Sequence, residues 1–162
     1  MPITKGKKAE MITELEGLLK GTQSMVFVNF HKLSVADTTN LRRGLRGNGV
    51  GYKVAKKTLV KRVLDSIAPT GTMPSLDGEL AIAYANDLLA PAREVYNFQK
   101  EHKDSVQIIG GVFEGKYMSK EEMLSIATIP GMQTLRAQFV NLINSPIQRF
   151  AVVLNAIAEK KV

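Results

Sequence analysis

The sequence predicts a layered α/β fold, in which a single mixed sheet is covered by helices and followed by a protruding C-terminal helix. Two observations predict this fold class. Over the first 130 residues, short apolar runs rich in β-forming residues alternate with segments whose apolar residues recur at helical spacing. The remaining stretch keeps helical spacing throughout. A length of 162 residues suits one compact domain with a short appendage, and the strand order stays open.

The first two elements follow from spacing and composition. Apolar residues at helical intervals predict an amphipathic helix over 8–20, which Gly21 ends. These residues are Met11, Ile12, Leu15, Leu18 and Leu19. The segment 25–30 reads MVFVNF, which is short, apolar and rich in β-formers, so a buried strand is expected there.

A second helix carries signals at both ends. Ser34 with Asp37 resembles a capping box in which Asp replaces the usual Glu. Leu41 and Leu45 supply its apolar stripe, and the segment 47–49, which reads GNG, ends it.

A strand is predicted next over 52–55, and Thr58 is predicted to cap a third helix that runs up to Pro69. The apolar residues of this helix are Leu59, Val63, Leu64 and Ile67.

The middle of the chain continues the alternation. Two Pro, two Gly and several small polar residues predict a loop over 68–78, before a strand over 80–85. Asn86 or Asp87 is expected to open a helix that reaches about Lys100.

A further strand is expected over 106–112, where Gly110 and Gly111 favour a bulge or a close approach of backbone. Ser119 and Glu122 form a capping-box signal for a short helix.

The natural boundary of the chain is the Pro-Gly pair at 130–131, beyond which only helical spacing remains. We therefore predict a globular domain over 1–130 and a C-terminal helical segment over 131–162.

The positive charge is gathered near the start of the chain. The net charge is +7, and the sequence pI is about 9.7. The first 62 residues hold thirteen basic and four acidic side chains, a net charge of +9, whereas the remainder holds nine basic and eleven acidic, a net charge of −2. Such polarisation favours an electrostatic surface for a polyanion. The absence of cysteine excludes disulfides, thiolate zinc sites and a cysteine nucleophile.

The candidate RNA-binding residues are the basic side chains of this early region. They are Lys5, Lys7, Lys8, Arg42, Arg43, Arg46, Lys53, Lys56, Lys57, Lys61 and Arg62. Arg42 and Arg46 are four residues apart, as are Lys57 and Lys61, so each pair lies on one helix face. The alternative is that these side chains are ordinary solvated residues on helix faces, but the scarcity of acidic residues in this region disfavours it. Tyr52 could add a stacking surface, but aromatics make up only 6% of the chain, which favours folded RNA over a single strand.

The candidate protein-binding residues lie in the C-terminal segment. They are Leu142, Ile143, Ile147, Phe150, Val153, Leu154 and Ile157, and Leu135 and Phe139 precede them at the same helical spacing. A helix over 134–161 would span about 42 Å, which is long for a small domain to cover, so the helices of another protein are the expected cover. The alternative is a terminal helix folded back on its own domain. Pro146, preceded by Ser145 and followed by Gln148 two residues on, predicts that a new helical segment begins there.

Catalytic and metal-binding interpretations find little support. His31 and His102 are far apart and lack flanking metal-ligand patterns, so neither is given a role. Neither glycine cluster matches a phosphate-cradling loop. Glu121 and Glu122 fit a first helical turn, where the helix dipole favours acids. No cofactor, no metal and no enzymatic activity are therefore expected.

Four strings resemble the bacterial ribosomal stalk-base protein, the tenth protein family of the large ribosomal subunit. They are SMVFVNFHKLSVADTTNLRRGLR (24–46), GVGYKVAKKTLVKRVL (49–64), IIGGVFEGK (108–116) and SPIQRFAVVLNAI (145–157). They occur in the family's order and extend over nearly the whole chain. One departure is Lys57, where the family commonly has Asn, so a contact assigned to that Asn does not carry over.

The resemblance implies a globular domain that binds large-subunit ribosomal RNA at the stalk base, beside the eleventh large-subunit protein. It also implies a C-terminal helix that holds dimers of the acidic stalk protein, which recruit translation GTPases. The location would be the cytoplasm, on ribosomes, with an organellar ribosome left open. Two alternatives to this function are a free RNA-binding translational regulator without stalk partners and a small α/β enzyme, which the lack of an assembled catalytic group disfavours.

Overall fold

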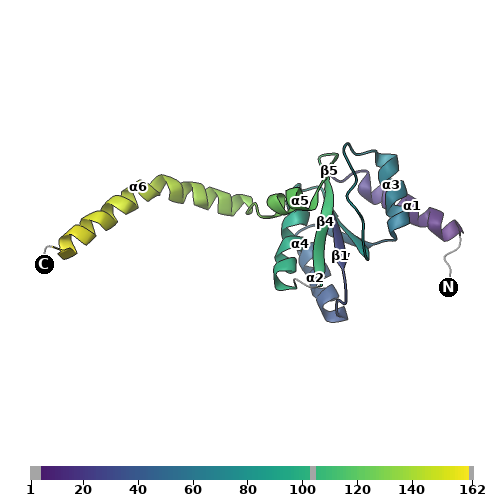
Figure 1. The fold of residues 1–162 in the computed structure, drawn as a ribbon, viewed down its shortest axis with the longest axis horizontal. Helices are drawn as coiled ribbons and strands as arrows, with labels where there is room; N and C mark the ends of the chain where they lie inside the picture. The colour runs from purple at the N-terminus through teal and green to yellow at the C-terminus, as the bar shows by residue number, and fades with distance from the viewer. Residues whose placement is uncertain (1–4, 103–104, 161–162) are drawn as a thin grey trace. The chain divides into compact units, whose positions relative to one another are not determined.

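The computed structural model describes residues 5–102 and 105–160, and the side chains from Gly6 onward in these ranges. The chain divides into two compact units, Met1–Ile129 and Pro130–Val162. The first contains alternating helices and strands, and the second consists of one long helix (Figure 1).

One five-stranded sheet forms the centre of the first unit. Its strands are β1 (Ser24–Phe30), β2 (Gly51–Val54), β3 (Leu80–Ala85), β4 (Val106–Phe113) and β5 (Lys116–Met118). Their order across the sheet is β2-β3-β1-β4-β5. The four strand pairs are all antiparallel, where the sequence predicted a mixed sheet. The layered α/β architecture itself is confirmed.

Helices cover both faces of this sheet. On one face lie α1 (Lys5–Leu19) and α3 (Lys57–Ile67), and on the other lie α2 (Val35–Gly47), α4 (Ala90–Glu101) and α5 (Lys120–Ala127) (Figure 1). This three-layer arrangement gives the unit two apolar cores, one on each side of the sheet.

Strand β1 shows how the sequence builds both cores. Because successive side chains of a strand point to opposite faces, Phe27 packs with α1 and α3 while Val26 and Val28 pack with α2, α4 and α5. All three side chains are fully buried. A central strand covered on both faces needs a continuous apolar run, which the string MVFVNF provides.

Two helices begin at the serines that the sequence indicated. The Asp37 amide donates to Ser34 Oγ over 3.1 Å, but the Ser34 hydroxyl donates to the Asp37 carboxylate, so the second bond of a capping box is replaced. At α5 the box is complete: the Glu122 amide donates to Ser119 Oγ, and the Ser119 amide donates to Glu122 Oε2 over 2.8 Å.

The expected cap at Thr58 is wrong. Helix α3 begins at Lys57, with Lys56 in the cap position, and the amides of Leu59 and Val60 both donate to the Lys56 carbonyl. The Lys56 side chain carries no acceptor and makes no capping hydrogen bond.

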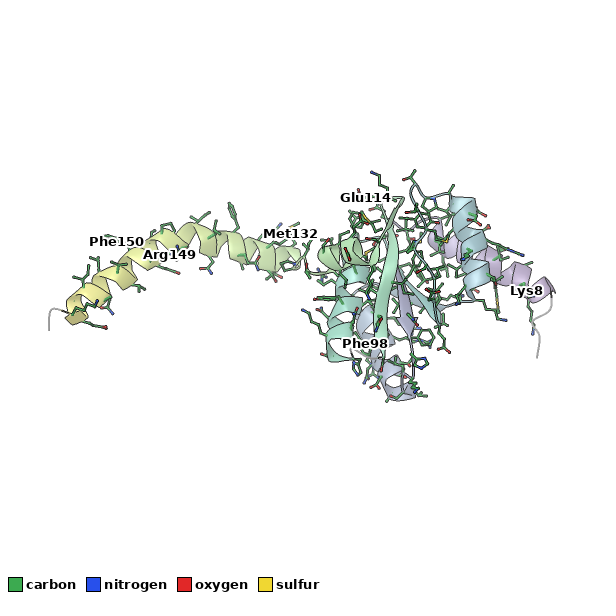
Figure 2. All side chains as sticks on the ribbon, viewed as in Figure 1. Lys8, Phe98, Glu114, Met132, Arg149 and Phe150 are labelled. Atoms are coloured by element: carbon green, nitrogen blue, oxygen red, sulfur yellow. The ribbon has the colours of Figure 1, made fainter. Side chains whose placement is uncertain are left out.

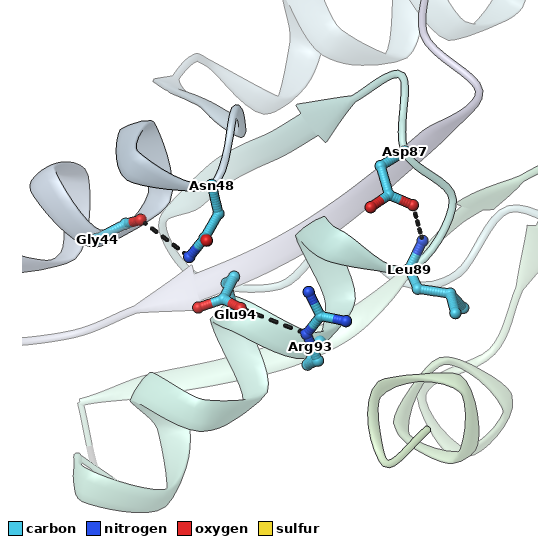
Figure 3. A network of polar contacts seen from close by, with 6 residues as sticks. All are labelled: Gly44, Asn48, Asp87, Leu89, Arg93 and Glu94. Carbon is cyan, nitrogen blue, oxygen red and sulfur yellow. Dashed lines mark hydrogen bonds and ion pairs between the residues drawn. The ribbon is translucent and has the colours of Figure 1, made fainter. Parts of the chain in front are cut away.

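Helix α4 starts slightly later than expected. Figure 3 shows the Asp87 carboxylate accepting a bond of 3.2 Å from the Leu89 amide, which closes the turn before the helix. The helix itself begins at Ala90, with Pro91 in its first turn, where a missing amide hydrogen costs nothing.

The glycine pair in β4 behaves as expected. The register between β1 and β4 shifts so that Ile109 has no partner on β1, which is a bulge. A Cβ on Gly110 would lie 2.7 Å from the Met118 carbonyl oxygen, and a Cβ on Gly111 would overlap Met123 and the Met25 carbonyl. Glycine is thus required by close packing at both positions. Strand β5 was not predicted, because its three residues are too short for a periodic pattern.

The second unit is a single helix, α6 (Met132–Lys160). The prediction that a new helical segment begins at Ser145 is wrong, because the helix continues through Pro146. It curves along its length (Figure 1), as expected where proline removes a backbone hydrogen bond and its ring crowds the preceding turn. Among the helices of residues 5–102 and 105–160, none combines the length and the hydropathy that a membrane-spanning segment requires.

Candidate nucleic-acid and protein interfaces

Helix α2 presents the densest group of the predicted cations. Leu41 and Leu45 are buried beneath the helix, which turns Arg42, Arg43 and Arg46 outward. With Thr39, these three arginines line a depression of about 350 Å³. Planar guanidinium groups can bind phosphate oxygens in pairs, so three of them around one hollow make a site suited to a phosphate backbone.

Tyr52 is less available for stacking than the sequence suggested. The Arg42 guanidinium lies 6.0 Å from the centre of the Tyr52 ring, a cation–π contact between α2 and β2. Burial raises the pKa of Tyr52 to about 12, against the opposing effect of the Arg42 charge. The phenol therefore stays neutral at physiological pH, and its ring supports Arg42 from below.

A second group of cations lies on the opposite face of the sheet. Lys57, Lys61 and Arg62 are exposed on α3, and Lys56 precedes them. Lys57 and Lys61 share one side of the helix, while Arg62 is turned about 100° from Lys61. The single basic set predicted from the sequence thus falls into two groups, carried by helices on different layers.

Strand β2 lies between these two groups. Its Tyr52 contacts Arg42 of α2, whereas its Lys53 forms an ion pair with Glu14 of α1. Because neighbouring residues of a strand point to opposite faces, this edge strand joins the two basic groups across the thickness of the unit.

Two further members of the predicted set lie on α1. Lys7 and Lys8 are exposed at the start of this helix, and Figure 2 labels Lys8 there. The side chain of Lys5 lies outside the described part of the chain. Within the described ranges, Lys53 is the one predicted cation at ion-pair distance from an acid, so the others remain available for phosphates.

The predicted protein-binding residues lie along α6. Leu142, Ile143, Ile147, Phe150, Val153, Leu154 and Ile157 are each more than half exposed. Their spacing of three and four residues places them on one side of the helix, and Figure 2 labels Phe150 among them. A single helix has no second element within its own unit to bury such a stripe. Three further apolar side chains of α6 that were not predicted from the sequence, Met132, Val140 and Val152, are also exposed.

The two histidines have structural surroundings. The His102 ring stacks on Phe98 with ring centres 4.3 Å apart, and its Nε2 lies 3.7 Å from Asp37 Oδ1. The His31 amide donates to the Ser105 carbonyl over 2.8 Å. In the part of the chain that the structure describes, no group of three or more His, Asp and Glu side chains could hold a metal ion.

Comparisons with known proteins identify a family that this chain resembles. The family model for ribosomal protein L10 matches residues 3–100. A relative from Oceanobacillus iheyensis, named large ribosomal subunit protein uL10, is 33% identical over 156 residues, which is 96% of this chain and 93% of the relative. A relative of the same name from Bacillus cereus is 34% identical over 155 residues, 95% of this chain and 93% of its own length. A Bacillus anthracis protein of that name gives the same values.

Proposed function

This chain belongs to the ribosomal protein L10 family, and from that premise we propose that it binds large-subunit ribosomal RNA at the base of the lateral stalk and anchors dimers of the acidic stalk protein. It is a ribosomal protein and not an enzyme. The first unit is the RNA-binding part, beside the eleventh large-subunit protein. Helix α6 holds the dimers, which in turn recruit translation GTPases.

The observation that carries this proposal is the separation of two kinds of surface. Within the described ranges, cations without an acid at ion-pair distance gather on α1, α2 and α3 of the first unit, whereas the exposed apolar stripe lies on α6 of the second. Cations of this density suit phosphates, and an apolar stripe on a single helix suits the grooves of partner helices. The two functions therefore occupy separate parts of the chain.

Binding to ribosomal RNA is expected to weaken steeply with salt, because each phosphate that a cation neutralises releases condensed counterions. If about five phosphates are neutralised, the plot of log affinity against log salt concentration should have a slope of about −4. Affinity would then fall by at least about 100-fold between about 50 mM and about 200 mM salt. Filter binding or fluorescence anisotropy with a stalk-base RNA fragment measures this slope. Binding that does not respond to salt would contradict the proposal.

The alternative is a free RNA-binding translational regulator without stalk partners. Under that alternative the isolated chain should protect residues 130–162 from limited proteolysis, because the terminal helix would be buried against its own domain. Under the proposal, the same segment is cleaved first in the isolated chain and gains protection when the acidic partner is added.

A further inference from the structure

A large cavity opens at the end of the sheet where β1 and β2 finish and α3 begins. Its volume is about 840 Å³, within the range of roughly 300 to 1,000 Å³ that is usual for ligand pockets. Its wall is mainly apolar and includes Met11, Leu15, Phe30, Val54, Leu59 and Leu80. We refer to it as the sheet-end cavity. It lies wholly within the first unit, between α1 and α3.

The wall of the sheet-end cavity includes apolar side chains that are exposed to water, which is unfavourable. Val54 is 46% exposed and Met11 is 39% exposed, although both are large apolar residues in an otherwise well-buried unit. Exposed apolar groups gathered around a concavity mark a site where a bound partner would remove apolar surface from water. An occupant with an apolar face would cover both.

The lining also carries charged side chains, three basic and two acidic. Lys53, Lys56 and Lys57 line the sheet-end cavity, with Glu14 and Glu79 as the opposing acids. Lys53 is already paired with Glu14, but Lys56 and Lys57 have no acid at ion-pair distance within the described ranges. The two free lysines therefore favour an anionic group at the mouth of an apolar cavity.

We infer that the sheet-end cavity receives one unstacked base of the bound RNA, with the flanking phosphates at Lys56 and Lys57. A nucleotide joins a flat ring with apolar faces to a phosphate, which matches an apolar interior beside two free ammonium groups. The inference rests on the proposed RNA binding and adds that the RNA is read at a single extruded nucleotide, not by backbone contacts alone. Phe30 and Val54 offer the base its apolar surroundings.

The lining acid gives the occupant a chemical preference. Glu79 lines the sheet-end cavity and has no cation at ion-pair distance within the described ranges. A carboxylate accepts hydrogen bonds, so it favours a base with an exocyclic amino group, namely adenine, cytosine or guanine, over uracil, whose one base donor is its ring N–H.

The test fills the cavity without changing charge. Val54→Trp places a large ring at the mouth, and its matched control is Val35→Trp, at a residue of α2 that is 85% exposed and does not line the cavity. The wild type and both full-length variants are titrated with a stalk-base RNA fragment. They are also titrated with a set of derivatives of this fragment, each of which lacks one base. Thermal unfolding verifies that the variants are folded. If Val54→Trp does not fold, Met11→Trp replaces it, because this variant fills the cavity from α1.

Val54→Trp should lower RNA affinity by about 10- to 100-fold relative to Val35→Trp, because a stacked base is lost, and leave the salt slope unchanged, because no cation is lost. One abasic position should weaken wild-type binding by a similar factor and have no further effect on Val54→Trp. The inference would be overturned if Val54→Trp and Val35→Trp bound RNA with equal affinity. It would also be overturned if every abasic position weakened binding by Val54→Trp as much as it weakens binding by the wild type. In both cases the proposed RNA binding would stand. So would a variant that keeps RNA but loses the neighbouring eleventh protein, because the occupant is then a peptide. Wild-type protein that binds no RNA would remove the proposed function itself.

Discussion

Replacing Phe150 with Asp should reduce the affinity for dimers of the acidic stalk protein by at least about 100-fold. Phe150 is 66% exposed in the isolated chain and lies at the centre of the α6 stripe. In the proposed complex its ring is buried among apolar side chains of the partner. An aspartate there would have to be buried without a counter-ion, which costs several kcal/mol in addition to the lost apolar contact. Isothermal titration with the purified acidic protein measures the change.

The matched control is Gln148→Asp. Gln148 is exposed on α6 about 200° around the helix from Phe150, so the variant adds the same negative charge on the polar side. It should bind dimers within about threefold of the wild type. RNA affinity should be unchanged in both variants, because the α2 and α3 cations are untouched. Unchanged dimer binding by Phe150→Asp would remove the stripe from the proposed interface.

The double variant Arg42→Glu with Arg46→Glu should lower RNA affinity by about 100-fold or more at about 100 mM salt. Two cations of the α2 depression are replaced by acids that repel the same phosphates. The slope of log affinity against log salt should become shallower by about 2, since each lost phosphate contact removes about one unit. Dimer capture by α6 should be unaffected.

Net charge alone can be separated from position with a control of equal charge change. Arg136→Glu with Arg149→Glu alters two exposed arginines of α6 and changes the net charge by the same amount. This control should keep its RNA affinity within about threefold of the wild type. Equal losses in the two double variants would show that the RNA responds to total charge and not to the α2 site. Denaturant unfolding verifies that loss of the contact between Arg42 and Tyr52 leaves the fold intact.

The elements that the sequence predicted well are those with strong local signals. Ser119 and Glu122 form a full capping box, and the apolar run around Phe27 forms a strand buried on both faces. The start of one predicted helix was wrong, because tertiary packing decides it. Helix α3 begins at Lys57 although Lys56 supplies no cap, because Leu59 and Val60 are buried in the core.

The candidate sites show the same distinction. The order of charges along the chain indicated a basic surface, but the sequence did not indicate that α2 and α3 lie on opposite faces of the sheet. Strand order decides that placement, and strand pairing is a long-range property. The sheet-end cavity was also missed, because its lining comes from five separate elements. In α6, the apolar spacing was stronger evidence than Pro146, which bends the helix without ending it.

Native mass spectrometry of the full chain, mixed with the acidic stalk protein and a stalk-base RNA fragment, tests whether the two units bind different partners at the same time. If the cations of the first unit hold RNA while α6 holds dimers, one particle should contain one chain, one RNA and an even number of acidic protein copies. We expect two dimers. Particles that contain RNA or acidic protein but never both, or a chain that carries neither, would contradict this division.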